Sequence, residues 1–275
     1  MKKLHDRVAV ITGAASGIGR GLAHVLAGKG CHLALVDVDA GGLEKVKHEL
    51  AMTQRRVTTY VVDVSDREVM TALPDLVVAD HGAVHIVINN AGVTIGGELA
   101  TQSLDDLDWI VGINFWGVLY GCRFFAPVLQ QQDEAHIVNI SSLFGLVGLP
   151  GQGAYCATKA AVRSLSQSLS AEFADTNVRV TSVHPGGIRT NIVANARFPD
   201  ADEQRELIAF FEKLRVSPEH AAKRIVSAIE NEKPRLRITI ETIVSDWILR
   251  FFPVTAWRLV DWSTRREKRK QAQAG

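Results

Sequence analysis

The sequence contains 275 residues, of which 47% are hydrophobic, and its formal net charge is +1. This composition allows one large hydrophobic core, and the near-zero charge argues against a nucleic-acid partner. The three cysteines show no CxxC spacing and no Cys/His pairing, which argues against a metal site and predicts reduced thiols in a cytoplasmic protein. The N-terminus has no signal-peptide pattern and no run reaches the roughly 18 apolar residues of a membrane span.

Short runs rich in β-branched residues alternate with longer segments of helical pattern. Continuously apolar runs are typical of parallel strands buried on both faces, and the intervening segments are long enough to be crossover helices. The sequence therefore predicts an α/β fold, Rossmann-like and doubly wound, with a mainly parallel seven-stranded sheet and helices on both faces. We expect one dinucleotide-binding catalytic domain over residues 1–240, with strands at 7–11, 32–36, 56–62, 85–88, 136–140, 178–183 and 237–240.

A glycine-rich turn, TGAASGIGR at 12–20, follows the first expected strand and precedes a helical pattern. Gly13, Gly17 and Gly19 let the backbone turn sharply and approach a pyrophosphate, whose charge a helix N-terminus favours. The spacing differs from the common GxGxxG fingerprint, so a glycine turn that binds no ligand is the alternative interpretation.

The second expected strand ends in LVDVD, which places Asp37 24 residues beyond Gly13. At that distance a carboxylate can accept hydrogen bonds from an adenosine ribose, and it repels a 2′-phosphate. Asp37 therefore favours NAD over NADP. Either Asp37 or Asp39 could instead cap the next helix, and Asp39 suits that role better.

Ser142, Tyr155 and Lys159 combine side chains that suit acid/base chemistry. Lys159 follows Tyr155 by four residues, about one helical turn, so the phenol and the ammonium project from the same helix face. A free phenol has a pKa near 10, and a neighbouring cation favours its ionised form. A serine hydroxyl can help to polarise a carbonyl oxygen.

Five motifs in this order resemble the short-chain dehydrogenase/reductase family, over about residues 4–240. They are TGAASGIG at 12–19, NNAG at 89–92, Asn114 within VGINFWGV, Ser142 with YCATK at 155–159, and HPGGIRT at 184–190. Each follows the expected strand where the family places it, which a motif needs as support. A single YxxxK recurs by chance, whereas the ordered set is specific.

The resemblance implies four catalytic roles. Tyr155 would exchange a proton with the substrate oxygen, and Lys159 would lower the pKa of the phenol and hold the nicotinamide ribose. Ser142 would orient the carbonyl, and Asn114 would support a water linked to Lys159. Besides the three glycines, Asp37, Tyr155 and Lys159, the implied cofactor contacts are Ser16, Ile18, Asp63, Val64, Asn90, Ala91, Gly92, Pro185, Gly186, Ile188 and Thr190.

Three of these residues have simpler interpretations. Asn114 could be an ordinary helix residue, and Ser141 could replace Ser142 as the active hydroxyl, although the family offset selects Ser142. Cys156 lies beside Tyr155, yet a free cysteine is usually a small buried hydrophobic residue.

The substrate pocket is expected where loops meet the carboxyl ends of the strands. One such loop, LFGLVGLPG after Ser142, is almost wholly apolar, and the segment 188–216 is expected to form an amphipathic lid. Such a lining predicts a small lipophilic alcohol or ketone, such as a steroid, a retinoid or a fatty chain. The same side chains could simply pack the lid against the body. The expected substrate contacts are Ser142, Leu143, Leu149, Tyr155 and Ile192.

Residues 241–275 form an amphipathic, aromatic and basic extension. Apolar residues recur at helical spacing from Ile240 to Phe251, Pro253 interrupts the pattern, and the basic stretch RREKRK follows at 265–270. Packing on a second subunit or on the same chain, peripheral binding to a membrane, and covering the pocket mouth would all use such a face.

The sequence thus predicts an oxidoreductase that transfers hydride between NAD(H) and a hydrophobic secondary alcohol or ketone. The alternatives are an enzyme of the same fold that uses bound cofactor for epimerisation or dehydration, and a non-catalytic nucleotide-sensing protein. The resemblance also suggests a homodimer or homotetramer.

Overall fold

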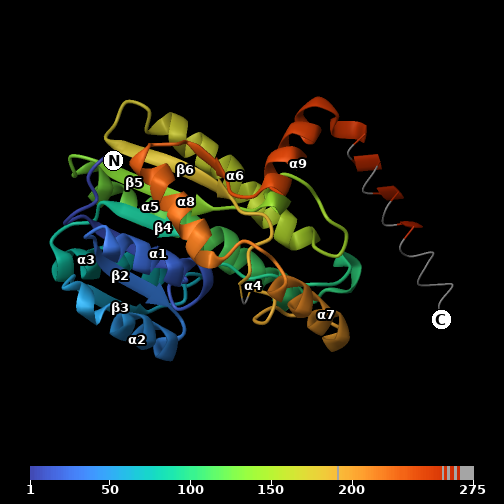
Figure 1. Ribbon diagram of the computed structural model, residues 1–275, viewed down its shortest axis with the longest axis horizontal. Coiled ribbons are helices and arrows are strands. Elements are labelled where there is room, and N and C mark those ends of the chain that lie inside the picture. Colours follow the sequence, from blue (N-terminus) through green and yellow to red (C-terminus); the bar gives the residue numbers. More distant parts are fainter. Residues whose placement is uncertain (191, 256, 259–260, 263–264, 267–275) are drawn as a thin grey trace.

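The computed structural model describes residues 1–275 except 191, 256, 259–260, 263–264 and 267–275 (Figure 1). Seven parallel strands form one sheet in the order β3-β2-β1-β4-β5-β6-β7. The strands are β1 (Val8–Thr12), β2 (His32–Asp37), β3 (Val57–Val61), β4 (Ile86–Asn89), β5 (Ala135–Ile140), β6 (Val178–His184) and β7 (Arg235–Arg237). The predicted doubly wound sheet is confirmed.

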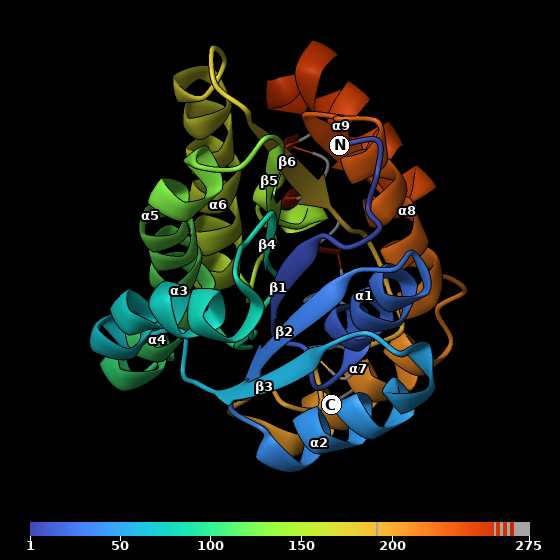
Figure 2. The same cartoon turned by 90° about the vertical axis from the view of Figure 1, so that its left-hand side faces the viewer.

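Helices cover both faces of this sheet, as Figure 2 shows. One face carries α3 (Arg67–His81), α4 (Leu104–Val111), α5 (Gly117–Gln130) and α6 (Gly153–Glu172). The other carries α1 (Gly17–Gly28), α2 (Ala40–Glu49) and α8 (Pro218–Glu230). Two further helices, α7 (Ala201–Glu212) and α9 (Ile240–Phe251), follow β6 and β7.

Successive strand residues enter two different cores. In β1, Ile11 packs with the side chains of α1 and α8, whereas its neighbour Val10 packs with those of α3 and α5. In β2, Leu35 and Val36 divide in the same way. Because side chains alternate across a strand, a sheet buried on both faces needs apolar residues at every position. This explains the continuous apolar runs of the sequence.

The last strand differs from the expectation. β7 spans Arg235–Arg237 and pairs with β6, whereas the sequence suggested 237–240. Ile238 is buried in the core beyond the end of the strand, and Ile240 already begins α9. The predicted position of the last strand is therefore wrong, because the β-branched residues after Arg237 form a buried connection and the start of a helix.

The helical stretch Leu104–Gln130 is, within the described ranges, long and apolar enough to cross a membrane. It runs from α4 through a π-helical turn, Gly112–Trp116, into α5. Its side chains Val118, Phe125 and Leu129 are buried in the core between α5 and the sheet. Packing against the sheet accounts for its apolar composition.

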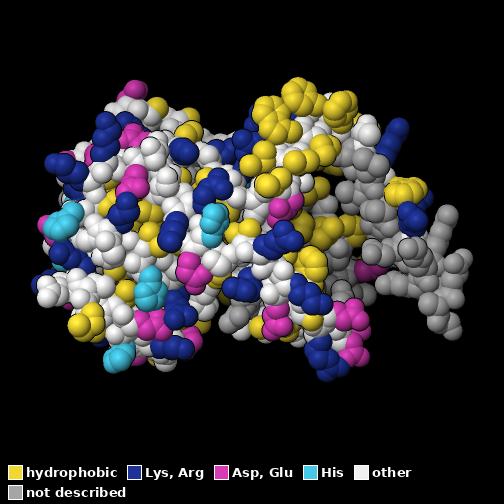
Figure 3. All heavy atoms as spheres, in the orientation of Figure 1, with side chains coloured by type: hydrophobic (Ala, Val, Ile, Leu, Met, Phe, Trp, Pro, Cys, Tyr) yellow, Lys and Arg dark blue, Asp and Glu magenta, His cyan; other side chains and the backbone are white. Residues whose placement is uncertain are grey.

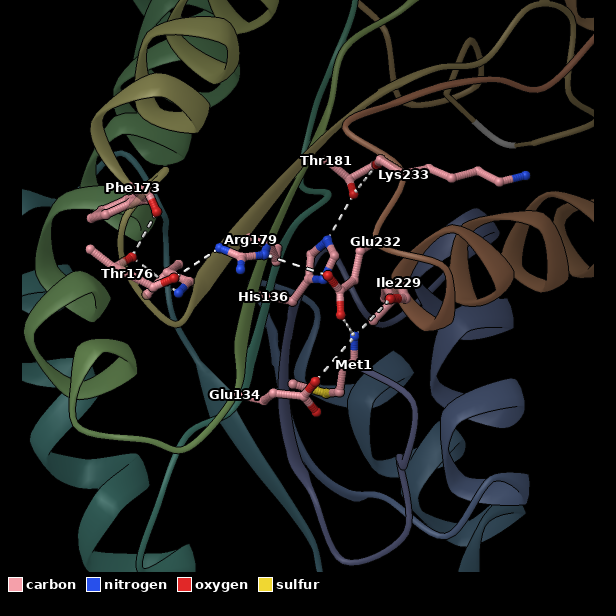
Figure 4. A network of polar contacts seen from close by, with 11 residues as sticks. Met1, Glu134, His136, Phe173, Thr176, Arg179, Thr181, Ile229, Glu232 and Lys233 are labelled. Atoms are coloured by element: carbon pink, nitrogen blue, oxygen red, sulfur yellow. Dashed lines mark hydrogen bonds and ion pairs between the residues drawn. The ribbon is translucent and has the colours of Figure 1, made fainter.

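A polar network joins β5, β6 and the turn before β7 (Figure 4). His136 Nε2 lies 2.7 Å from Thr181 Oγ1, which donates to the carbonyl of Lys233 at 2.7 Å. Glu232 accepts from the amino group of Met1 at 2.8 Å and pairs with Arg179 at 3.5 Å. Burial lowers the pKa of His136 to about 3, so this imidazole is neutral at physiological pH and serves packing rather than chemistry.

Candidate active site

Helix α6 presents Tyr155 and Lys159 from consecutive turns, as the four-residue spacing requires. Both are buried, at 9% and 3% exposure, and Lys159 Nζ lies 5.8 Å from the centre of the Tyr155 ring. The ammonium donates a hydrogen bond to the carbonyl of Ile140 at 3.1 Å, at the end of β5. The strand thus fixes the position of the cation beside the phenol.

Ser141 and Ser142 follow β5 but point to different partners. Ser141 Oγ donates to the backbone carbonyl of Lys159 at 2.7 Å, which ties the strand to α6. Ser142 Oγ accepts from the backbone N–H of Phe144 at 3.1 Å, and its hydroxyl also hydrogen-bonds the Tyr155 side chain. Ser142, rather than Ser141, therefore lies beside the phenol.

Asn114 sits in the π-helical turn and is completely buried. Its side chain accepts from the N–H of Val93 at 2.8 Å and donates to the carbonyl of the same residue at 2.9 Å. A longer contact of 3.3 Å joins it to Thr158 of α6. A π-helical turn inside an α-helix commonly marks a functional site, and here it directs the amide toward the loop after β4.

Gly92 separates Asn114 from Lys159. A Cβ atom at this position would lie 3.1 Å from Lys159 Nζ and 3.2 Å from Asn114 Oδ1. A larger residue would therefore crowd both polar groups. The structure brings Asn114, Ser142, Tyr155 and Lys159 around one site.

Burial dominates the protonation of the two titratable groups. It raises the pKa of Tyr155 to about 12, against the hydrogen bond from Ser142, which lowers it. It lowers the pKa of Lys159 to about 8. The chain's own residues thus do not make the phenol acidic, contrary to the direction expected from Lys159 alone. The reason is that burial disfavours both charged forms.

The loop after β1 lies against the segment after β4. Gly13 has a φ of +65°, and a Cβ atom there would lie 2.8 Å from Ala91 Cα. Thr12 Oγ1 accepts from the N–H groups of Asn90 and Ala91, both at 3.0 Å, and Asn90 Nδ2 donates to the carbonyl of Thr12 at 2.8 Å. The two segments form one cradle at the carboxyl edge of adjacent strands, where such sheets bind dinucleotides.

The entry of α1 suits a phosphate group. Ser16 occupies the N-cap without a side-chain cap bond, Gly17 has a φ of +52°, and a Cβ on Gly19 would collide with the carbonyl of Gly13. Ile18 anchors the turn against the core. The helix N-terminus therefore approaches the cradle with backbone only, as dinucleotide binding requires.

The two aspartates after β2 have separate roles. Asp37 accepts from the N–H of Ala15 at 2.9 Å, which places its carboxylate on the glycine-rich loop. Asp39 caps α2 by accepting from the N–H of Gly42 at 2.9 Å. The division between a loop carboxylate and a helix cap agrees with the preference derived from the sequence.

The remaining expected cofactor residues line the same edge. Asp63 accepts from the N–H of Ser65 at 2.9 Å, and Val64 packs against Gly117. The carbonyl of Pro185 accepts from the N–H of Leu143 at 2.7 Å. Thr190 lies over Gly17, 3.4 Å from the position of a Cβ there. Buried Ile188 pairs with Val216 in an isolated bridge.

The turn at Gly186 and Gly187 rests on the start of α9. A Cβ on Gly186 would meet Thr239 and lie 2.8 Å from Thr242 Oγ1. Glu241 Oε1 accepts from the N–H of Gly187 at 3.3 Å. Only glycine fits at position 186, between this turn and the helix.

The expected substrate residues divide into two groups. Ile192 packs with Tyr155 and Phe144 in one apolar cluster, and the Phe144 ring meets the Tyr155 ring edge-on at 6.3 Å. Leu149 is 39% exposed, and its N–H contacts Cys156 Sγ at 3.4 Å. Leu143 is half-buried on the turn after Ser142. Ile192 and Phe144 thus form the wall next to the phenol, and Leu149 lies at its rim.

Arg197 fastens the lid segment to the body. Its guanidinium pairs with Asp106 at 2.7 Å and lies 4.0 Å from the centre of the Trp109 ring. The carbonyl of the same residue accepts from the N–H of Gly96 at 3.0 Å, and Phe198 packs on Gly96. These contacts hold the segment between β6 and α7 over the apolar cluster.

A model of the short chain dehydrogenase family matches residues 7–200. The chain belongs to this family. SadH of Mycobacterium tuberculosis, named as an oxidoreductase, is 41% identical over 264 residues, which cover 94% of this chain and 96% of SadH. It follows that this chain is an oxidoreductase of the short-chain dehydrogenase family.

Two solved structures show the same fold. A short-chain dehydrogenase/reductase from Burkholderia phymatum in complex with NAD has a TM-score of 0.86 and 31% identity, covering 91% of this chain and 95% of that one. An alcohol dehydrogenase from Thermococcus sibiricus, complexed with 5-hydroxy-NADP, has a TM-score of 0.73 and 27% identity, covering 85% and 94%. Both of these proteins thus hold a nicotinamide dinucleotide on the fold that carries the cradle in this chain.

Sequence reasoning missed the hydrogen bonds that hold the site together. Thr12, Ser141 and Thr158 bond to backbone or to other polar side chains and carry no chemistry of their own. Thr12 lies inside the glycine motif and Thr158 inside YCATK, so their place was visible but their partners were not. Arg197 had no signal, because its partners lie far away in the chain.

Proposed function

We propose that this enzyme transfers hydride between NAD(H) and a hydrophobic secondary alcohol or ketone, with Tyr155 as the acid/base. The observation that carries the proposal is the burial of Asn114, Ser142, Tyr155 and Lys159 around one site at the end of β5. Bound NAD(H) would supply or accept the hydride. The side chains would orient the substrate oxygen and move its proton.

The protonation state of Tyr155 favours reduction, because that direction requires no shift of the phenol pKa. With a pKa of about 12, the Tyr155 phenol is protonated at neutral pH and ready to donate to a carbonyl oxygen. Oxidation needs the phenolate, and lowering this pKa to near 7 requires roughly 7 kcal/mol. Lys159 is still mostly charged at pH 7, yet the phenol beside it keeps this high pKa, so the stabilisation would have to come with the bound cofactor.

The preference for NAD rests on Asp37. Its carboxylate lies on the glycine-rich loop and accepts from the backbone N–H groups of Ala15 at 2.9 Å and Asp39 at 3.1 Å. A negative charge there accepts hydrogen bonds from a ribose diol and repels a 2′-phosphate.

The substrate class rests on the wall beside the phenol. Phe144, Ile192 and Ile95 belong to the apolar cluster that contains Tyr155. A polar substrate would lose its hydration at this wall without gaining partners. A small lipophilic alcohol or ketone would bury apolar area there instead.

The test compares two tyrosines. Tyr155→Phe should lower turnover by about 10²–10⁴-fold, because only the proton-transfer oxygen is lost. NAD binding, measured by fluorescence titration, should stay within about twofold of the unsubstituted enzyme because the ring remains. Tyr120→Phe on α5 is the matched control and should leave turnover unchanged. Assays run in both directions over a panel of lipophilic alcohols and ketones; turnover that survives Tyr155→Phe would refute the role of Tyr155.

We further propose a homodimer or homotetramer in which α5 packs on a second subunit. Trp116, Tyr120 and Phe124 stack in sequence along this helix, with ring centres 5.7 Å and 5.6 Å apart, and Trp116 is 44% exposed. Sedimentation velocity of the full chain tests this expectation, and a monomer at assay concentration would overturn it. The cytoplasmic location remains a prediction from the sequence.

A further inference from the structure

Helix α9 buries its polar side and exposes its apolar side. Thr242 and Asp246 are 0% and 5% exposed, whereas Trp247 and Phe251 are 49% and 67% exposed. Asp246 accepts from Arg235 at 2.7 Å and from Arg237 at 2.8 Å, so two ion pairs with β7 fix the rotation of the helix. The apolar face cannot turn inward without breaking these pairs.

The exposed face is continuous and aromatic. Trp247 and Phe251 stack with ring centres 5.7 Å apart and an angle of 5° between their planes. Figure 3 shows hydrophobic side chains gathered over α9 and bordering the hollow between α9 and α7. Exposed apolar residues continue beyond the helix. On α9 and after it, the exposed large hydrophobic residues are Ile240, Val244, Trp247, Ile248, Phe251, Phe252, Val254, Trp257 and Trp262. A contiguous patch of this kind marks an interaction surface.

The charge of the chain is divided at the same place. Residues 247–275 contain seven Lys and Arg and two Asp and Glu, a net charge of +5, so the other residues carry −4 because the whole chain carries +1. Arg258, Arg265 and Arg266 alternate with Trp257 and Trp262 in this segment. Aromatic residues interleaved with cations are typical of segments that lie in a membrane interface.

We propose that α9 and the aromatic, basic segment after it bind the surface of an anionic lipid bilayer. The aromatic side chains enter the boundary between headgroups and acyl chains, and the cations face the lipid phosphates. A symmetric contact with a second copy would bring two segments of +5 together, which costs electrostatic energy. Charge complementarity therefore selects the anionic membrane over a second copy of the chain.

The membrane surface adjoins the active site. Glu241 in the first turn of α9 accepts from the N–H of Gly187, and Thr242 packs beneath Gly186. A lipophilic substrate dissolved in the bilayer would thus leave the membrane near the turn at Gly186 and Gly187, which follows β6 at the same edge of the sheet. The lipid contact itself does not depend on the proposed reaction.

Vesicle flotation of the full-length protein tests the proposal. The unsubstituted protein should float with phosphatidylcholine–phosphatidylglycerol vesicles, and raising the salt concentration should lower the bound fraction. The double variant Trp247→Gln/Phe251→Gln should bind about tenfold less or weaker still, because each ring carries a large apolar area. Met52→Gln is the matched control and should bind normally, since Met52 is 92% exposed in the turn that follows α2, and Figure 1 shows α2 far from α9.

Four results would overturn the proposal. They are no flotation with anionic vesicles, equal flotation with phosphatidylcholine alone, equal binding by the double variant, and dissociation of an oligomer by the double variant without any vesicle binding. The last would assign the face to a second copy. Dinucleotide binding by the double variant, followed by fluorescence, verifies that its fold is intact. Salt dependence and lipid dependence of the unsubstituted protein test the proposal without any substitution.

Discussion

Two buried charges, one on α6 and one on α9, are handled in opposite ways. Lys159 is 3% exposed, and its ammonium donates a hydrogen bond to the neutral carbonyl of Ile140. Asp246 is 5% exposed and pairs with Arg235 and Arg237 of β7. The first charge is held by a dipole and the second by full opposite charges.

The difference appears in the proton affinity of each group. Burial lowers the pKa of Lys159 to about 8, so its charge changes near physiological pH. Burial raises the pKa of Asp246, but hydrogen bonds and charge from Arg235 and the neighbouring arginines bring it below its ordinary value. A buried charge that can be lost serves proton chemistry, whereas a charge held on both sides fixes the orientation of a helix.

The largest expected effect comes from breaking the paired charge. Asp246→Asn should lower the free energy of unfolding by about 3 kcal/mol, because Arg235 and Arg237 lose their counter-charge. Urea unfolding followed by circular dichroism measures the change. Asp261→Asn is the matched control, since its pair with Arg265 is exposed, at 60% and 71%, and should be worth less than about 1 kcal/mol. Equal effects of the two substitutions would erase the contrast.

The charge of Lys159, which has no opposite charge beside it in the structure described, should make the free energy of unfolding depend on pH. Between pH 8 and pH 10 the unfolded chain keeps the Lys159 proton while the folded chain releases it, so stability from this group rises with pH. The expected rise is about 2 kcal/mol over that window. Lys159→Met should remove it, as judged by urea unfolding of both proteins at the two pH values. Parallel pH profiles would show that Lys159 titrates normally.

A third case is the half-buried carboxylate of Asp37, which is held by backbone N–H groups. Asp37→Ala should reduce the preference for NAD over NADP, measured as the ratio of the two kcat/KM values, by about tenfold. Asp39→Ala removes the cap of α2 instead and should weaken stability without changing this ratio. Unchanged discrimination in Asp37→Ala would refute the ribose role.

The smallest effect is expected at an exposed pair. Arg197→Ala removes the contacts to Asp106 and to the Trp109 ring that hold the lid segment. Together they are worth about 1 kcal/mol, so KM for a lipophilic substrate should rise about fivefold with kcat nearly constant. Arg205→Ala on α7 is the control, because its partner Asp202 lies on the same helix. A rise of KM of the same size in the control would show that the contacts of Arg197 do not cause the change.

The sequence predicted the sheet and the proximity of Tyr155 to Lys159 for a physical reason. Strands buried on both faces are continuous apolar runs, and Tyr155 and Lys159 share a helix face through local spacing alone. The glycines of the cradle could be predicted because close backbone contacts leave no room for a larger residue. Features that depend on residues close together in the sequence can thus be predicted from it.

What could not be predicted depends on distant partners. The apolar face of α9 was identified, but its outward orientation follows from Asp246 meeting Arg235 and Arg237, which hydrophobic periodicity does not register. The π-helical turn at Asn114 likewise places its amide against Val93, a contact between segments that local spacing does not show. The raised pKa of Tyr155 reflects burial, whereas the sequence showed only the neighbouring cation.

The way α9 begins beneath Gly186 has a practical consequence for shortened versions of this enzyme. A chain truncated near residue 240 would lose the floor formed by Thr242 and Glu241 under that turn, along with the counter-charge for the arginines of β7. Inactivity of such a truncation would therefore report a collapsed turn at the reacting end of the cradle. Point substitutions on the outer face of α9 test the role of that face more directly, because they leave Thr242 and Glu241 in place under the turn.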